Sequence, residues 1–344
     1  MPLERLSEAP STVLLRLCET IDENESPERR TILQAYRNVL LGHESPNTRK
    51  AYARDLDWFA WTYSEYHDRE EVDVLLNLPA LANRSVAIWY RDTLRSSVGA
   101  RGKLLSDGTL NRRLAVLSAV FHEFQRAGLS VNGNPFKGLN VGKRYDPTPA
   151  LSNEDRQRLV QAPDYLNAPT IDDRQRWLRD RILIGLLFIQ GIRREEARLV
   201  KTSDVGESQG HPVLAVRQKG GHSILFRLHP KLGAYIEAYR NEFMGDDGYL
   251  FTGLSTNGSG RPDKPISPQA INWIVSHWGK VAGITQKVTP HVGRATVITE
   301  ALKRAPLQVV SIAIGHASPE TTARYDRSRD RMERAIVNYQ DVDF

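Results

Sequence analysis

The sequence lacks the features of a secreted, disulfide-bonded or membrane-spanning protein. Its 344 residues include one cysteine, Cys18, which excludes a disulfide within the chain. The longest apolar run, at 182–189, has arginines on both sides and is far shorter than the roughly 20 residues that cross a bilayer, so we expect a buried helix there. The first residues do not show the basic-then-apolar order of a secretion signal. We therefore expect a cytoplasmic protein with no membrane partner.

What the chain does have is enough apolar sequence for a substantial core and enough length for two domains. Apolar residues make up 40% of it and charged residues 26%, a composition typical of globular proteins. The segment 141–150 is polar and contains prolines, which is typical of a linker. We predict a helical N-terminal extension at 1–44, a helical domain at 45–140, a linker at 141–150 and a second domain at 151–344.

The spacing of apolar residues predicts a mainly α fold with a small β-sheet in the C-terminal domain. The clearest predicted helices span 48–61, 83–95, 109–127 and 174–190. Only 213–216 and 224–228 are convincing strands, and 218–222 joins them as a hairpin. We expect a polar loop before the first strand, a loop rich in Gly, Ser and Pro at 253–268, and helices in the rest of this domain.

Charge is distributed unevenly along the chain. The net charge is +6, but residues 1–83 hold 9 Lys and Arg against 15 Asp and Glu, whereas 84–144 hold 11 against 3. A basic stretch of this kind indicates a surface for nucleic-acid phosphates, although a solvated helix face with clustered arginines is the alternative. The candidate DNA-contacting residues are Arg49, Lys50, Arg84, Arg91, Arg95, Arg101, Lys103, Arg112, Arg113, Lys143 and Arg144.

The second domain carries residues that could cleave a phosphodiester without a metal. Tyr325 can attack phosphorus and form a covalent phosphotyrosine, which conserves the energy of the bond for resealing without ATP. Arg193 and Arg294 supply planar, permanently charged forks that suit the non-bridging oxygens of one phosphate. Preorganised charge of this kind usually provides the largest share of such catalysis.

Three further residues can handle protons and hydrogen bonds around this phosphate. Lys219, near the tip of the predicted hairpin, could reach into the minor groove and protonate the leaving 5′-oxygen. Lys201 is the alternative lysine, but only a hairpin tip projects into a groove. His291 could move the proton of the tyrosine, and His316 could donate a hydrogen bond to the scissile phosphate.

Two other motifs are rejected on their context. The segment 206–210 matches the Gly-x-Ser-x-Gly pattern of hydrolases, but that pattern must follow a strand and open a helix, and here it precedes a strand. The histidines of the second domain come with arginines rather than with carboxylates or cysteines, and cations repel a metal ion. We therefore expect no metal and no cofactor.

The order and spacing of these residues resemble the tyrosine recombinase (phage integrase) family, in the two-domain form of the Cre-type and Xer-type simple recombinases. The resemblance covers nearly the whole chain and is carried by 45–52, 111–114, 134–135, 191–199, 289–294 and 315–325. The sequence departs from the family at Gly293, where an apolar residue is common, at Ala295, often a second histidine, and at 194–195, which replace a small-polar pair. None of these changes removes a catalytic group.

The resemblance implies a helical core-binding domain and a mixed α/β catalytic domain that together clamp duplex DNA at an inverted-repeat site. It implies that the five basic residues assemble around the phosphate attacked by Tyr325, with Glu196 as a supporting carboxylate that orients them. It also implies that four protomers pair two sites, that a tail helix after Tyr325 docks on a neighbouring protomer through 335–337, and that the protein is nucleoid-associated when bound to DNA. The resemblance is also compatible with accessory proteins that set the direction of recombination.

The predicted function is site-specific recombination of DNA through a 3′-phosphotyrosyl intermediate. A type IB topoisomerase-like enzyme that nicks and recloses DNA with similar residues is one alternative. A DNA-binding protein of the same fold without strand exchange is another, but a pure binder has no need for Tyr325.

Overall fold

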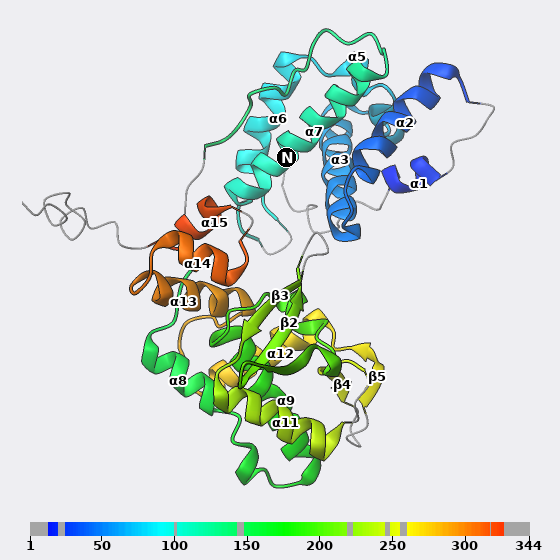
Figure 1. The fold of residues 1–344 in the computed structure, drawn as a ribbon. Coiled ribbons are helices and arrows are strands. Elements are labelled where there is room, and N and C mark those ends of the chain that lie inside the picture. Colours follow the sequence, from blue (N-terminus) through cyan, green and yellow to red (C-terminus); the bar gives the residue numbers. More distant parts are fainter. Residues whose placement is uncertain are drawn as a thin grey trace, which may run out of the picture. The chain divides into compact units, whose positions relative to one another are not determined.

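The computed structural model describes residues 13–19, 25–99, 102–142, 148–218, 223–244, 248–254, 260–316 and 318–326, with the backbone alone at 260–262. The chain divides into two compact units, Met1–Tyr145 and Asp146–Phe344 (Figure 1). The division falls within the segment 141–150 that we expect to be a linker. The predicted tail helix after Tyr325 lies outside the described residues.

The regular elements in the described part of the first unit are helices, and an isolated β-bridge joins Val98 to Leu104. Its helices are α1 (Val13–Glu19), α2 (Pro27–Leu41), α3 (Pro46–His67), α4 (Glu71–Leu76), α5 (Leu78–Leu81), α6 (Arg84–Ser96) and α7 (Asp107–Arg126). Local chemistry fixes several of their starts. The Asn83 side chain accepts the N–H of Val86 at 3.0 Å, and the Ser106 hydroxyl accepts the N–H of Thr109 at 3.3 Å, which satisfies backbone donors of the first turn.

Aromatic rings fill the core of this unit. Phe59 of α3 meets Tyr90 of α6 edge to face, with ring centroids 4.8 Å apart, and Phe124 of α7 meets Tyr36 of α2 at 5.6 Å. All four side chains are fully buried or nearly so. Because α1 and α2 pack into the same core as α3 and α7, they are integral to the first unit.

The second unit combines helices with two small antiparallel sheets, so the predicted fold class is confirmed. Its helices are α8 (Asn153–Gln161), α9 (Ile171–Phe188), α10 (Arg194–Arg198), α11 (Pro230–Phe243), α12 (Pro268–Val281), α13 (Pro290–Leu302), α14 (Leu307–Ile314) and α15 (Pro319–Ala323). Its strands are β1 (Val205–Ser208), β2 (His211–Arg217), β3 (Ser223–Arg227), β4 (Thr252–Leu254) and β5 (Gly260–Pro265).

The sheets correct two expectations. The predicted hairpin is present as β2 paired with β3 in the order β1-β2-β3, but the expected polar loop before it contains β1. Gln209 and Gly210, with φ of 53° and 74°, form the two-residue turn between β1 and β2, a turn that suits the twist of a hairpin. The expected loop at 253–268 contains the paired strands β4 and β5. The unexpected strands β1, β4 and β5 are short and lack a clear alternation of apolar residues, so the sequence gives little indication of their pairing.

Helix α9 forms the centre of the second unit, and its buried stretch confirms the expected buried helix. Its packing explains one departure from the family pattern. A Cβ on Gly293 of α13 would lie 2.8 Å from the carbonyl oxygen of Leu187 and 3.1 Å from the ring of Phe188, closer than carbon atoms tolerate. Gly293 therefore lets α13 lie against the end of α9.

Across the described ranges, none of the helices combines the length and apolar character that a membrane span requires.

Candidate active site

Arg193 lies at the end of the short non-helical segment between α9 and α10. Gly191 has a φ of 70°, in the left-handed region that favours glycine. A Cβ there would lie 2.9 Å from Cδ1 of Ile314 and 3.0 Å from Cγ1 of Val297. Backbone conformation and close packing thus both require glycine at 191, and together they turn the chain so that Arg193 stands just before α10.

Glu196 fixes both ends of Arg193. Its Oε2 accepts the backbone N–H of Arg193 at 2.7 Å, and its Oε1 accepts Nη1 of the same arginine at 2.6 Å. Glu196 is buried, whereas 40% of the Arg193 side chain is exposed. The carboxylate therefore holds the guanidinium from behind and leaves its outer edge open.

Arg294 lies deeper, with only 3% of the residue exposed. It donates to two backbone carbonyls, from Nη1 to Gly191 at 2.8 Å and from Nη2 to Ile314 at 2.8 Å. The nearest carboxylate oxygen is Oε2 of Glu196, 3.9 Å from Nη1, and Nε has no hydrogen-bond partner among the described residues. Burial and the neighbouring charge of Arg193 lower the pKa of Arg294 to about 10. Its positive charge is thus incompletely neutralised, which makes this position suited to an anion.

His316 follows the left-handed C-cap residue of α14, Gly315, which has a φ of 69°. The carbonyl of Gly315 accepts a long hydrogen bond of 3.5 Å from Nη2 of Arg193, while Nδ1 of His316 lies 2.7 Å from the hydroxyl oxygen of Thr322. Burial, together with the charges of Arg294 and Arg193, lowers the pKa of His316 to about 4. His316 is therefore a neutral imidazole at neutral pH.

Tyr325 lies between the two histidines. Its ring stacks on that of His316, with centroids 6.1 Å apart and planes 15° apart, and the ring of His291 lies 6.4 Å away. Partial burial and the charge of Arg294 lower the pKa of His291, which favours a neutral imidazole able to accept a proton.

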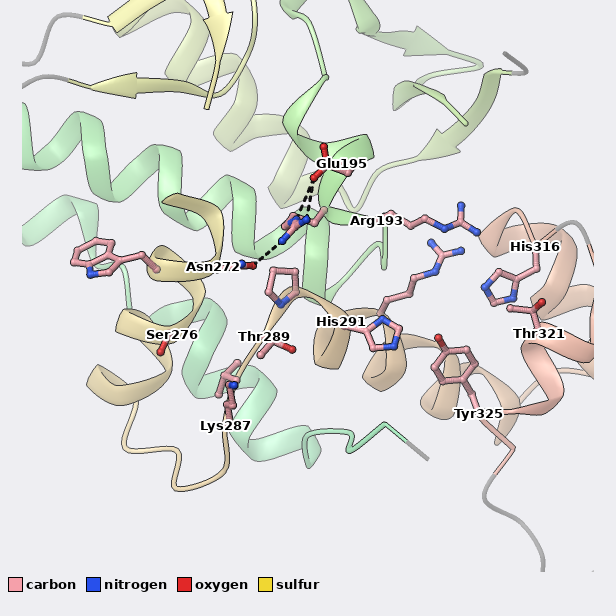
Figure 2. Close-up of a pocket in the computed structure, with 15 residues that line it drawn as sticks. Arg193, Glu195, Asn272, Ser276, Lys287, Thr289, His291, His316, Thr321 and Tyr325 are labelled. Carbon is pink, nitrogen blue, oxygen red and sulfur yellow. Dashed lines mark hydrogen bonds and ion pairs between the residues drawn. The ribbon is translucent and has the colours of Figure 1, made fainter. Parts of the chain in front are cut away.

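One hollow of about 910 Å³ is lined by Arg193, His291, Arg294, His316 and Tyr325. Figure 2 shows His291, His316 and Tyr325 gathered at one end, with Asn272, Ser276 and Lys287 toward the other. The residues that line the hollow are Arg193, Arg194, Glu195, Asn272, Trp273, Ser276, Lys287, Val288, Thr289, Pro290, His291, Arg294, His316, Thr321 and Tyr325. Five of the six residues predicted to be catalytic are therefore brought together.

The sixth, Lys219, lies outside the described residues. The alternative, Lys201, lies near the ring of Tyr249, with Nζ 5.9 Å from its centroid, and does not line the hollow. Gln218, which precedes Lys219 at the end of β2, packs against the backbone of Gly315, where a Cβ would collide with its amide. The stem of the hairpin is thus in contact with the segment that carries His316.

Several lining residues were missed by sequence reasoning. Asn272, Trp273 and Ser276 come from α12, and Lys287 precedes α13. No motif marks them, because they reach the hollow only through the packing of α12 beside α13. Thr289 does have a local signal, since a threonine before a proline is typical of a helix start, and its hydroxyl accepts the N–H of Val292 at 3.3 Å.

The candidate DNA-contacting residues fall into separate classes. Lys50, Arg84, Arg95 and Lys103 are exposed, and Arg84 also donates to the carbonyl of Pro135 at 2.8 Å. Partly exposed Arg49, Arg91 and Arg112 donate to the carbonyl of His43, to Asp92 and to Asp55, respectively. Arg101, Lys143 and Arg144 lie outside the described residues.

Arg113 departs from the expectation of a phosphate contact. Only 7% of it is exposed, and its guanidinium carbon lies 3.9 Å from the ring centroid of Trp58. Asp55, also buried, is 3.5 Å from its Nε. Arg113 points into the core because α7 packs on α3, and this burial keeps its guanidinium group from a phosphate.

The chemistry of the hollow fits a phosphate better than a metal ion. Two guanidinium groups, one of them incompletely neutralised, lie beside two histidines whose pKa values are lowered and a tyrosine hydroxyl. Cationic walls of this kind attract a phosphate and repel a metal ion. Within the described ranges, no group of three or more His, Cys, Asp or Glu side chains could hold a metal.

Comparisons with known proteins agree with this assignment. The profile of the "Phage integrase family" matches residues 150–332. A tyrosine recombinase of Synechococcus elongatus is 27% identical over 297 residues, which cover 85% of this chain and 88% of the relative. The tyrosine recombinase XerD of Ralstonia nicotianae is 28% identical over 297 residues, covering 83% and 85%.

Solved structures show a similar fold. The XerH site-specific recombinase bound to its palindromic difH substrate matches with a TM-score of 0.62 at 17% identity, covering 92% of this chain and 99% of that one. A lambda integrase dimer bound to a COC′ core site also matches with a TM-score of 0.62, at 16% identity, covering 87% and 96%.

Proposed function

Because this chain belongs to the phage integrase family and is a tyrosine-type site-specific recombinase, we propose that Tyr325 cleaves one DNA strand and remains attached to its 3′-phosphate. The observation that carries the proposal is the convergence of Arg193, Arg294, His291 and His316 on Tyr325 in one hollow. A regulator that only bound DNA would have no use for a nucleophile among anion-binding groups.

In the cleavage step, the phenol oxygen of Tyr325 forms a bond to phosphorus while the bond to the 5′-oxygen breaks. The phenol proton passes to His291, whose lowered pKa favours a free lone pair. Protonation of the leaving 5′-oxygen is assigned to Lys219, near the tip of the predicted hairpin. Attack by the 5′-hydroxyl of a second strand reverses the step, so resealing needs neither ATP nor a metal ion.

Arg193 and Arg294 have different roles in stabilising the negative charge that develops on the phosphate. Arg193 keeps an open edge, and within the described ranges Arg294 has only two carbonyl partners and a carboxylate 3.9 Å away. The neighbouring Arg194 is instead tied to Glu195 and Asn272. Arg193 therefore binds an oxygen at the surface of the hollow, and Arg294 binds one at its floor. Both charges are fixed before the phosphate arrives, which removes the cost of reorganisation.

The proposed assembly is a clamp of both units on duplex DNA and a tetramer on two paired inverted-repeat sites. Similarity to proteins solved as DNA complexes, including a lambda integrase tetramer bound to a Holliday junction, supports it. Helix α14 offers an apolar face for a second copy, since Val309 is 54% and Ile312 is 78% exposed. The segment 335–337 of a neighbouring tail would be its occupant.

The proposal is tested by trapping the covalent adduct on nicked duplexes tiled across the DNA that flanks the gene. Wild-type protein should form an adduct that peptide mapping places on Tyr325, and Tyr325→Phe should form none while it retains its DNA affinity. Adduct formation by Tyr325→Phe would show that another residue is the nucleophile. Tight, specific binding without any adduct from the wild type would favour a catalytically silent DNA-binding protein.

A further inference from the structure

Thr322, in α15, contacts both His316 and Tyr325 but is not itself a wall of the hollow. The residue has no exposed surface. Its hydroxyl oxygen lies 2.7 Å from Nδ1 of His316, and its carbonyl accepts the backbone N–H of Tyr325 at 2.9 Å. One buried residue thus connects the side chain of one active-site group to the main chain of another.

The direction of the hydrogen bond between Thr322 and His316 follows from counting donors and acceptors. A threonine hydroxyl carries one proton, and leaving that proton buried without an acceptor costs about 1–3 kcal/mol. Within the described part of the chain, Nδ1 of His316 is the one partner of this hydroxyl. The arrangement that satisfies the proton has the hydroxyl donating to an unprotonated Nδ1.

The charge state of the imidazole supports this direction. The pKa of His316 is lowered to about 4 by burial and by the charges of Arg294 and Arg193, so the ring carries one proton at neutral pH. If Nδ1 accepts from Thr322, that proton must lie on Nε2. Nε2 forms no hydrogen bond within the described part of the chain, so it remains available to a ligand.

We propose that Thr322 is a positioning residue that fixes the tautomer of His316, so that Nε2–H donates to a non-bridging oxygen of the scissile phosphate. This inference rests on the proposed function of the hollow. Thr322 also supports Tyr325, because its carbonyl holds the backbone of the nucleophile and the rings of Tyr325 and His316 are stacked. A change at Thr322 should therefore affect catalysis more than the binding of DNA.

The tautomer can be measured on the free protein, which separates this inference from the proposed function. In a full-length chain labelled with ¹⁵N-histidine, the resonances missing from His316→Asn identify His316. At neutral pH we expect a pyridine-like signal from Nδ1 and a pyrrole-like signal from Nε2. The opposite assignment, or equal populations of both tautomers, would overturn the inference even if the protein cleaves DNA.

Kinetics then test whether the hydroxyl matters for the reaction. Thr322→Val keeps the shape but removes the donor, and we expect single-turnover adduct formation on the nicked duplexes to slow about 10- to 100-fold with little change in DNA affinity. Thr322→Ser, which restores the hydroxyl, should recover most of the rate and the tautomer. Thr252→Val, a change at a buried threonine of β4 outside the hollow, is the control for the substitution itself.

Two outcomes of the kinetic test would overturn the proposal. One is an unchanged rate and an unchanged tautomer in Thr322→Val. The other is an equal loss in Thr322→Val and Thr322→Ser accompanied by equal thermal destabilisation, which would assign Thr322 to packing alone. If no variant, including the wild type, forms an adduct, the proposed function fails, but the tautomer measurement still decides the role of Thr322.

Discussion

Each unit buries one arginine of particular interest, and the two arginines differ in the groups that surround them. Arg113 of the first unit lies against the face of Trp58 and near the carboxylate of Asp55. Arg294 of the second unit is held by two carbonyls, with Arg193 nearby and its nearest carboxylate oxygen 3.9 Å away. Burial lowers the pKa of both arginines, and each leaves its Nε without a hydrogen-bond partner among the described residues. Arg113 is enclosed by core side chains, whereas Arg294 lines the hollow, where an anion can reach it.

Arg113 and Arg294 are chemically the same, but one contributes to stability and the other to the proposed chemistry. Arg113 and Arg112 both face the buried carboxylate of Asp55. Loss of Arg113 would leave Asp55 with one positive partner and would remove the packing on Trp58, so Arg113 serves the stability of the first unit. Arg294 faces Glu196 at 3.9 Å, and that carboxylate would keep its shorter ion pair with Arg193 if Arg294 were removed. Its removal should therefore cost catalysis more than stability.

The largest effects should come from replacing each of these two arginines, in separate variants, with a residue of similar volume. Arg294→Lys removes the planar fork, and we expect adduct formation to fall about 100- to 1000-fold because an ammonium group cannot keep the bonds to the carbonyls of Gly191 and Ile314 and also present a planar donor edge to the phosphate. Arg113→Met should instead destabilise the first unit by about 1–2 kcal/mol, since Asp55 keeps its ion pair with Arg112 and loses only the second of its two positive neighbours. Adduct kinetics and hydrogen exchange should be measured on both variants. The comparison is contradicted if Arg294→Lys mainly loses stability and Arg113→Met mainly loses the rate of adduct formation.

A smaller effect should follow from adding one carbon atom at Gly315. The left-handed φ of 69° costs an alanine roughly 1–2 kcal/mol, and its Cβ would collide with the Gln218 amide. We expect Gly315→Ala to lower the rate of adduct formation about 10-fold, because Arg193 and His316 both depend on this segment. Gly210→Ala, at a turn residue with a similar φ and no neighbour within contact distance, is the matched control and should keep its rate.

The pH dependence of stability should have opposite signs in the two units. His316 has its pKa lowered from 6.5 to about 4, so the unfolded chain takes up a proton first, and the second unit loses stability as pH falls from about 6.5 toward 4. Buried Asp57 accepts the N–H of Leu14 at 2.9 Å. Burial and the nearby charge of Glu71 raise its pKa from 3.8 to about 7, so the first unit loses stability as pH rises from about 4 through 7.

Hydrogen exchange followed unit by unit between pH 5 and 8 measures this contrast. Asp57→Asn should remove the loss of the first unit at high pH, which amounts to at most about 4 kcal/mol. His316→Asn should reduce the loss of the second unit at low pH, and the lowered pKa of His291 accounts for a part that remains. Parallel pH profiles in both units would refute the assignment of these groups.

The smallest effect should come from single surface cations of the first unit. Lys50 and Lys103 are exposed, and each substitution by alanine should reduce the slope of log affinity against log salt by about 1 if that lysine contacts a phosphate. Binding to unrelated duplexes should weaken equally, because phosphate contacts carry no base information. Arg113→Met provides the contrast, since a buried arginine should leave the slope unchanged.

The sequence by itself determined the local structure and the residue types of the chemistry. Apolar spacing is visible in a single helix, so the bounds of α6, α7 and α9 could be predicted to within about three residues, whereas α3 extends six residues beyond the predicted end at 61. A hairpin such as β2–β3 is specified by neighbours in the chain. The catalytic types could also be proposed, because phosphate chemistry needs a nucleophile and fixed cations in any fold.

Only the tertiary structure decided which of these residues face a ligand and which face the core. Arg113 and Lys103 belong to the same basic stretch, yet packing of α7 on α3 buries one while the other stays exposed. Thr322 looks like any threonine near a helix end until α15 brings its hydroxyl to His316. The physical reason is that burial and hydrogen-bond partners arise from contacts between segments far apart in the chain, and these contacts determine whether a charge remains unpaired and which proton a group carries.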